Sequence, residues 1–310
     1  MVDFVLHNEE YESGYLEQVQ ENLDLASNSG FSGIQVRSMM IDGDFEKDTV
    51  FSGDVTFNSR DPSGTAVRPS ERFDLQEHIG VKVHYNTPKQ IIPQSDLARS
   101  NFSNEMYSNQ LGRNVAQNEW KYILNQSIRA LKAAIPVEPT NNLTSAAFAK
   151  TDFVKALRPL KDNSEDVSGF LMARSTLFDV IEEGIDQNRY GEVGPVVYGQ
   201  SPGTLGLPVM ASALESLDDG TNQWMFALFP EAMMITLNSN APSVIIREND
   251  DTENHFYTWS MDGTYNLKVR GISYIGNGGN VTDALLTTPA NWAVVASSPE
   301  NQAGTLTTFG

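Results

Sequence analysis

A histidine close to several carboxylates is the arrangement in this sequence that comes nearest to a metal site or a general base. His255 follows Asp250, Asp251 and Glu253, and imidazole and carboxylate side chains can bind metals or transfer protons. The remaining histidines are His7, His78 and His84. None of them belongs to an HExxH helix or lies near a second histidine at ligand spacing. We therefore interpret the segment as a solvated acidic turn beside a strand, and we expect His84 on the surface.

Other motifs that could do chemistry fail on spacing. The acidic residues from Asp42 to Asp48 surround Gly43, but this glycine is misplaced for an EF-hand loop. The loop from Gly199 to Gly206 lacks the Lys-Ser/Thr pair of a phosphate loop and the Rossmann spacing. SxxK does not occur, and the single GxSxG match, Gly199-Gln200-Ser201-Pro202-Gly203, lies in this Gly/Pro loop, which we interpret as a strand connector and not as a nucleophile elbow. The sequence therefore predicts a protein that is not an enzyme, with no catalytic residues, cofactor or metal.

Composition limits the remaining classes of function. The chain has 310 residues, a hydrophobic fraction of 40%, no cysteine and a formal charge of -19. This length predicts two subdomains, and the lack of cysteine excludes disulfides and thiolate metal sites. So acidic a surface disfavours sequence-specific binding to phosphates. The sequence has neither a secretion signal nor an apolar stretch long enough to span a bilayer, so we expect no membrane partner.

The amino-terminal half reads as an arm, a hairpin and a long helix. Apolar positions between Tyr15 and Leu25 predict one short helix in an otherwise extended arm. Strict alternation from Ile79 to Tyr85 predicts the second strand of a long hairpin, for which we expect support from a neighbour. Apolar residues at helical spacing then predict a helix from Ser95-Asp96 to Pro136, with Trp120 on its buried face. Gly112 could allow a bend.

The carboxyl-terminal half reads as a mixed α/β unit followed by strands. We expect a helix from Leu143 to Leu160, a buried strand from Val167 to Ala173, a helix from Ser175 to Gly184 and a strand from Leu207 to Ala211. Trp224 to Ile275 is a hydrophobic block, broken by Pro230-Glu231-Ala232, that leads into aromatic strands. This pattern predicts a shape-holding sheet.

The order of these elements resembles the major capsid proteins of tailed bacteriophages, the Hong Kong 97-type fold. Leu143 to Ile185 is similar to the helix, strand and helix at the entry to that family's A-domain. YGQSPGTLGLPVMAS (Tyr198 to Ser212) resembles the loop in which an LG-PV strand follows a turn. Trp224 to Tyr274 resembles the block in which a FALF-like strand leads to the aromatic P-domain hairpin.

This resemblance implies an α+β fold with named regions. It implies an N-arm at residues 1–42, an extended E-loop hairpin at 43–88, and a P-domain with its spine helix at 89–142. The A-domain would cover residues 143–238, and the P-domain sheet and C-terminal segment residues 239–310. Basic and acidic residues interleaved in the hairpin are candidates for ion pairs between subunits. These residues are Arg60, Asp61, Arg68, Glu71, Arg72 and Asp74.

The function that follows is that of a structural major capsid protein. Such a subunit would self-assemble into hexamers and pentamers of an icosahedral virion shell, formed in the host cytoplasm around double-stranded DNA. Portal protein and separate scaffolding or decoration proteins are its expected partners. An encapsulin-type nanocompartment shell is the alternative of the same fold, disfavoured by the extended arm and the lack of a strong amino-terminal cargo-docking helix. A secreted β-rich hydrolase or carbohydrate-binding module is the alternative of a different class.

Overall fold

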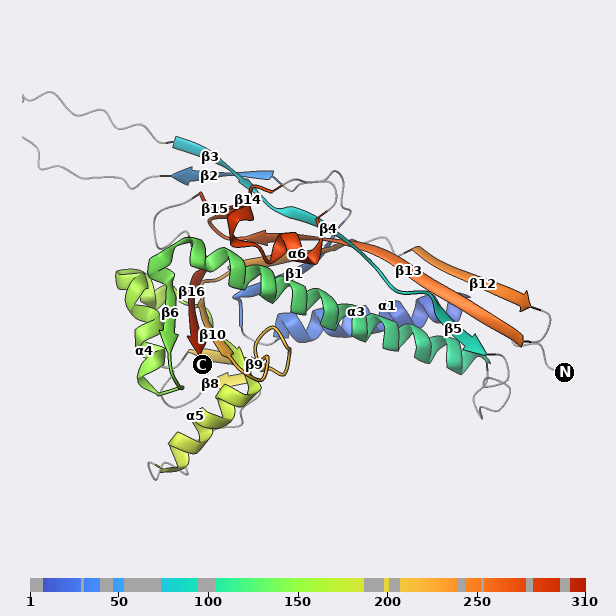
Figure 1. Cartoon of the computed structure of the whole chain (residues 1–310), viewed down its shortest axis with the longest axis horizontal. Helices are drawn as coiled ribbons and strands as arrows, with labels where there is room; N and C mark the ends of the chain where they lie inside the picture. Colours follow the sequence, from blue (N-terminus) through green and yellow to red (C-terminus); the bar gives the residue numbers. More distant parts are fainter. Residues whose placement is uncertain are drawn as a thin grey trace, which may run out of the picture.

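The computed structural model describes residues 8–28, 31–39, 47–52, 74–93, 104–186, 198–200, 207–238, 243–251, 254–276, 281–295 and 302–310. Two sheets and a long helix organise them, and a two-stranded hairpin projects from one side (Figure 1). None of the helices in the described ranges is long and apolar enough to cross a bilayer.

The larger sheet has eight strands gathered around one very long strand, β13 (Asn254–Val269). Its neighbours along the sheet are β1 (Ile34–Met39), β4 (Val81–Asn86), β5 (Gln90–Pro93), β11 (Met233–Asn238), β12 (Ser243–Asp251), β14 (Ile272–Tyr274) and β15 (Trp292–Val294). β12 and β13 form an antiparallel pair in which Asp250 lies opposite His255. The strands therefore extend through most of the expected acidic turn, and the described residues contain no cluster of possible metal ligands.

The long helix α3 (Asn104–Ala134) lies along this sheet (Figure 1). Its 31 residues correspond to about 46 Å at 1.5 Å per residue. Ile123, Ile128 and Leu131 are fully buried in the main core. The expectation for Trp120 was wrong, because this side chain is only half-buried. The start expected at Ser95-Asp96 lies outside the described residues.

The amino-terminal segment is more structured than an extended arm. α1 (Asn8–Asn28) is longer than the short helix that we expected, and it packs along α3 (Figure 1). β1 then joins the large sheet, parallel to β11. Leu16, expected on the buried face of the helix, is 54% exposed. The physical reason is that the side of α1 facing α3 is formed by Tyr11 and Tyr15 instead.

The second sheet has six strands in the order β6-β16-β10-β7-β9-β8. These are β6 (Asn142–Ser145), β7 (Gly169–Ala173), β8 (Tyr198–Gln200), β9 (Pro208–Ser212), β10 (Gln223–Leu228) and β16 (Gly304–Phe309). α4 (Thr151–Leu157) and α5 (Arg174–Asp186) accompany it. Phe153 and Phe170 meet edge to face at 4.8 Å in its core. The buried strand β7, the strand β9 and the helix α5 confirm three of the sequence-based expectations.

Short helices complete the chain. They are η1 (Ile135–Val137), η2 (Pro139–Asn141), η3 (Arg158–Asp166), α6 (Asp283–Leu286) and η4 (Pro289–Asn291). The helix expected from Leu143 to Leu160 was too long at its start, because residues 142–145 form β6 and pair in parallel with the carboxyl-terminal strand β16. Local sequence patterns do not reveal a strand partner so far away in the chain.

The block from Trp224 to Ile275 is divided between the two sheets. β10 belongs to the six-stranded sheet, whereas β11 belongs to the eight-stranded sheet. The chain changes sheet at Pro230-Glu231, where Glu231 has a φ of 57°. β16 also joins the six-stranded sheet, so each sheet contains strands from both of the residue ranges 143–238 and 239–310. The single shape-holding sheet expected over this block is therefore corrected to parts of two sheets.

Candidate assembly interface

The hairpin that carries the predicted interface residues begins as a two-stranded sheet. β2 (Lys47–Ser52) pairs antiparallel with β3 (Asp74–Ile79), so the predicted hairpin is confirmed at its base. Asp74 is the first residue of β3 and lies opposite Ser52. The other five candidates, Arg60, Asp61, Arg68, Glu71 and Arg72, lie outside the described residues.

The base of the hairpin offers little apolar burial of its own. Leu75, Gln76 and Glu77 on β3 are exposed, Leu75 by 61%. Among the described residues, β2 has β3 as its sole strand partner. Unpaired strand edges have backbone donors and acceptors that favour pairing with another chain.

A buried histidine attaches β3 to the body of the molecule. His78 is 4% exposed, and its Nε2 atom lies 2.6 Å from the carbonyl oxygen of Val269 and 3.1 Å from that of Ile272. Because both partners are acceptors, Nε2 carries the proton and donates. His78 thus joins the hairpin to the turn between β13 and β14. The sequence did not single out His78, whereas His84, expected on the surface, is exposed.

Further polar contacts hold the same place. The Ser273 hydroxyl accepts a hydrogen bond from the backbone N–H of Ile79 at 3.0 Å and donates to the carbonyl of Glu77 at 3.3 Å. Lys268 forms an ion pair with Asp48, and the Lys268 side chain is only 11% exposed. Because the Lys268 side chain is nearly enclosed, this ion pair is screened less by solvent than an exposed pair would be.

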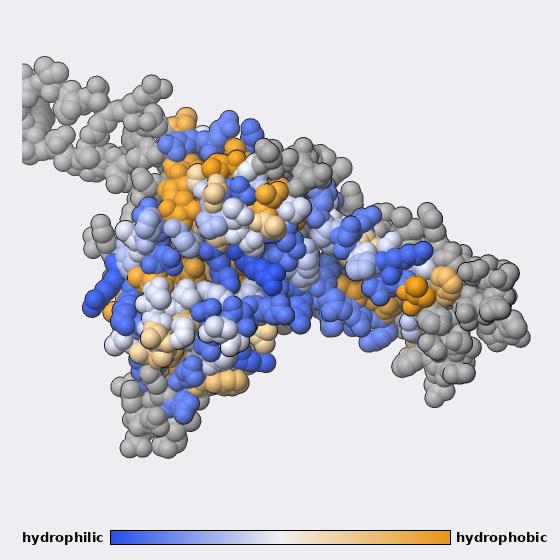
Figure 2. Space-filling model, viewed as in Figure 1, coloured by the Kyte–Doolittle hydropathy of each residue, from blue (hydrophilic) through white to orange (hydrophobic). Residues whose placement is uncertain are grey.

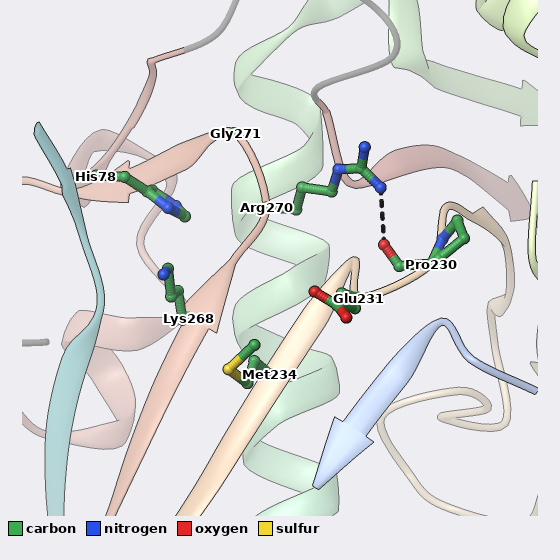
Figure 3. A pocket seen from close by; sticks show the side chains of 7 residues that line it. All are labelled: His78, Pro230, Glu231, Met234, Lys268, Arg270 and Gly271. Atoms are coloured by element: carbon green, nitrogen blue, oxygen red, sulfur yellow. Dashed lines mark hydrogen bonds between the residues drawn. The ribbon is translucent and has the colours of Figure 1, made fainter. Parts of the chain in front are cut away.

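A hollow of about 380 Å³ lies beside this attachment (Figure 3). It is lined by His78, Pro230, Glu231, Met234, Lys268, Arg270 and Gly271. Figure 3 shows the side chains of His78 and Lys268 approaching each other from β3 and β13. On the other side, Arg270 donates to the carbonyl of Pro230 at 2.8 Å, and Gln35 holds the Glu231 carboxylate at 3.0 Å. These contacts are structural, and the lining contains no serine, threonine or cysteine that could act as a nucleophile.

Apolar side chains are also exposed on the described surface. Figure 2 shows apolar patches separated by hydrophilic surface, including one near the base of the hairpin. The large apolar side chains that are most exposed are Leu16, Leu75, Ile91, Met106, Phe178 and Ile275. Exposed apolar groups that form contiguous patches mark interaction surfaces. The single subunit thus leaves apolar side chains exposed at several places, including Leu75 at the base of the hairpin.

Known proteins give a consistent comparison. Residues 3–306 match the Gp13-like family, described as major capsid protein 13-like. A structure from Mycobacterium phage Bobi matches with 11% identity and a TM-score of 0.52, covering 91% of this chain and 89% of that one. One from Microbacterium phage Oxtober96 has 13% identity, a TM-score of 0.49, and coverage of 76% and 83%. The mature capsid of bacteriophage PhiM1 has 12% identity, a TM-score of 0.48, and coverage of 78% and 83%. No curated protein matches.

The family match spans nearly the whole chain, and the Bobi structure supports the Hong Kong 97-type fold. The protein is therefore structural and not an enzyme, which sets aside the hydrolase alternative. α1 removes one argument against a nanocompartment shell, because an amino-terminal helix is present after all. The preference for a virion protein now rests on the family itself. The chain belongs to the Gp13-like family of major capsid proteins and forms the shell of a virion.

Proposed function

We propose that copies of this capsid protein assemble into hexamers and pentamers, and that the β2–β3 hairpin of each subunit lies on its neighbour. The observation that carries this proposal is the base of the hairpin, which has two strands, the exposed side chain of Leu75 and polar anchors to its own subunit. A two-stranded hairpin is marginally stable alone in water. Pairing of its edges with a second copy would satisfy the backbone groups that one subunit leaves open.

The six charged residues of the hairpin would add ion pairs between subunits. Arg60, Arg68 and Arg72 alternate with Asp61, Glu71 and Asp74 along the sequence. Charged residues of either sign on a neighbouring subunit could therefore find a partner in the hairpin. An exposed pair contributes only about 0 to 1 kcal/mol. Closed symmetry repeats the contact at every subunit, so weak pairs can together stabilise a shell.

The regional names follow the same proposal. Residues 1–42 would be the N-arm, 43–88 the E-loop, 89–142 and 239–310 the P-domain and C-terminal segment, and 143–238 the A-domain. β11 comes from the A-domain range but joins the eight-stranded sheet, and β16 comes from the P-domain range but joins the six-stranded sheet. These two strands would then connect the A-domain to the P-domain. Because α1 packs on α3 of its own subunit, the hairpin, rather than the N-arm, would make the main contact with a neighbouring subunit.

The proposed partners follow from the role of a shell. The shell would assemble in the host cytoplasm and enclose double-stranded DNA without reading its sequence, because the net charge of -19 repels phosphates. A portal protein would occupy one vertex, and separate scaffolding or decoration proteins would act during or after assembly.

Deletion of residues 52–72 tests the proposal. We expect the variant to remain folded, with thermal unfolding close to that of the parent, and to form no shells in electron micrographs. Normal particles from the deletion variant would overturn the proposal.

Charge reversal separates the ion pairs from the hairpin itself. Arg60→Glu, Arg68→Glu and Arg72→Glu together should lower the particle yield, whereas reversal of the exposed Lys89 and Lys121 should not. Equal particle yields from both sets of variants would show that the charged residues do not contribute to the interface. The interface would then depend on the backbone groups at the strand edges.

A further inference from the structure

The helices α1 and α3 touch backbone to backbone. A Cβ atom at Gly112 would overlap the carbonyl oxygen of Tyr11, and one at Gly14 would overlap the carbonyl oxygen of Asn109. Each helix thus has a glycine at the point where it comes closest to the other helix. Gly112, for which the sequence suggested a bend, is required for this close approach.

An apolar cluster seals the contact between α1, α3 and the sheet. α1 contributes Tyr11 and Tyr15, which are 3% and 7% exposed, and their rings stack with centroids 6.5 Å apart. The other buried members of the cluster are Val115, Ala116, Trp259 and Met261. On the outer side, Arg113 pairs with Glu17 at 2.6 Å and with Glu21 at 3.6 Å. α1 therefore covers apolar surface that would otherwise face water.

A carboxyl group lies inside this contact. The hydroxyl of Tyr15 on α1 donates to Oε2 of Glu119, and the hydroxyl of Tyr85 on β4 donates to Oε1. Burial raises the pKa of Glu119 above its ordinary value of 4.5, and the two tyrosine hydrogen bonds only partly oppose this shift. Burial and the neighbouring Glu119 also raise the pKa values of Tyr11, Tyr15 and Tyr85, so these tyrosines stay protonated at physiological pH.

The groups around Glu119 identify it as the one that titrates. α1 presents Tyr11 and Tyr15 and β4 presents Tyr85. Trp259 and Met261 of β13 belong to the same apolar cluster as Tyr11 and Tyr15 and do not titrate. In the described part of the chain, the groups that shift the pKa of Glu119 are tyrosines, together with burial itself. A change in the charge of Glu119 therefore acts directly on the contact between α1 and α3.

We propose that α1 is a strap that closes on the spine helix of its own subunit and that Glu119 makes its closure sensitive to pH. When α1 is docked, Glu119 is partly buried and bonded to Tyr15, and departure of α1 would expose it further to water. Closure is favoured fully below the ordinary carboxyl pKa, because the buried carboxyl is then neutral. It weakens as the pH rises through the raised pKa of the docked state, by up to about tenfold in the closure equilibrium for each pH unit.

Hydrogen–deuterium exchange of the purified full-length protein tests the strap. After correction for intrinsic exchange rates, peptides from α1 should be better protected at about pH 5 than at about pH 8. Peptides from β7, which lies in the other sheet, serve as the internal control and should show no such trend. Equal protection of α1 at both values would overturn the proposal.

Two variants assign the effect to Glu119. Glu119→Gln keeps the shape and the acceptor oxygen but has no charge to bury, so protection of α1 should become independent of pH and exceed that of the parent at about pH 8. Tyr15→Phe keeps the ring but removes one donor, so protection should fall more at about pH 8 than at about pH 5. If Glu119→Gln retained the parent's pH dependence while β7 stayed protected, another group would be responsible and the proposal would fail.

Gly112→Ala provides the reference for an open strap. Its Cβ prevents the helices from meeting, so α1 should exchange rapidly at both pH values. These measurements need no assembled particle, and their outcome does not depend on which surfaces join subunits. A failure of the strap and a failure of the proposed hairpin interface are therefore distinguishable.

Discussion

Two peripheral segments of this subunit, α1 and the β2–β3 hairpin, are attached to the same body by different means. α1 buries aromatic side chains against α3 and β13 and has a glycine at the point of closest approach. The hairpin is held by hydrogen bonds from His78, by Ser273 and by the Lys268–Asp48 ion pair, and it leaves Leu75 exposed.

The magnitudes explain what this difference means. Burial of one large side chain contributes about 1.5 to 3 kcal/mol, so two tyrosines can hold α1 in place. A hydrogen bond contributes a net of about 0.5 to 1.5 kcal/mol, and exposed ion pairs contribute less. α1 thus completes its own subunit, whereas in our proposal another copy completes the hairpin.

Among the variants that test this comparison, Tyr15→Ala should have the largest effect on stability. It removes a buried ring and leaves one oxygen of Glu119 without its donor, so we expect the free energy of unfolding to fall by about 3 kcal/mol. Denaturant unfolding of the unassembled protein measures this change. Leu16→Ala, on the exposed side of the same helix, is the control and should change stability by less than about 0.5 kcal/mol. Similar losses from both variants would mean that α1 is not packed as part of the core.

His78→Ala should have an intermediate effect that is confined to the hairpin. The carbonyls of Val269 and Ile272 lose their shared donor, at a cost of about 1 to 2 kcal/mol. Hydrogen exchange should increase in β2 and β3 more than in β10. His84→Ala, which changes an exposed histidine on the next strand, should leave exchange unaltered. A loss of protection spread evenly over both sheets would contradict the view that the hairpin is a separate attachment.

Lys47→Ala should have the smallest effect. Lys47 pairs with Glu77 at 3.5 Å, and both side chains are more than half exposed, at 57% and 69%. Water and salt screen such a pair, so we expect a change below about 0.5 kcal/mol, matching Lys89→Ala. A clearly larger loss in thermal unfolding would show that exposed charges, rather than the buried anchor at His78, hold the base of the hairpin.

Local patterns predicted much of the fold but not its long-range pairings. Alternation identified the hairpin, and helical spacing identified α3 and α5. The same patterns could not show that residues 142–145 pair with the carboxyl-terminal strand, or that β10 and β11 separate at Glu231. Trp120 follows helical spacing and is nevertheless only half-buried, because helical spacing does not reveal how wide a stripe the neighbouring elements cover.

The candidate site divides in the same way. The charged residues of the hairpin were visible in the sequence, but five of the six lie outside the described residues, and their role remains a proposal. His78 and Glu119 were not singled out, because a lone histidine in a strand and a glutamate in a helix are usually exposed. Tyr11 and Tyr15, one helical turn apart, were the available signal for a buried side of α1.

By itself, the sequence determined the charge, the lack of cysteine chemistry, the order of the elements and the resemblance to capsid proteins. The tertiary structure alone decided that α1 packs along α3, that β10 and β11 belong to different sheets, and that a buried histidine anchors the hairpin. The physical reason is that periodicity reports which side of an element is apolar. Which distant element covers that side depends on contacts between residues far apart in the chain.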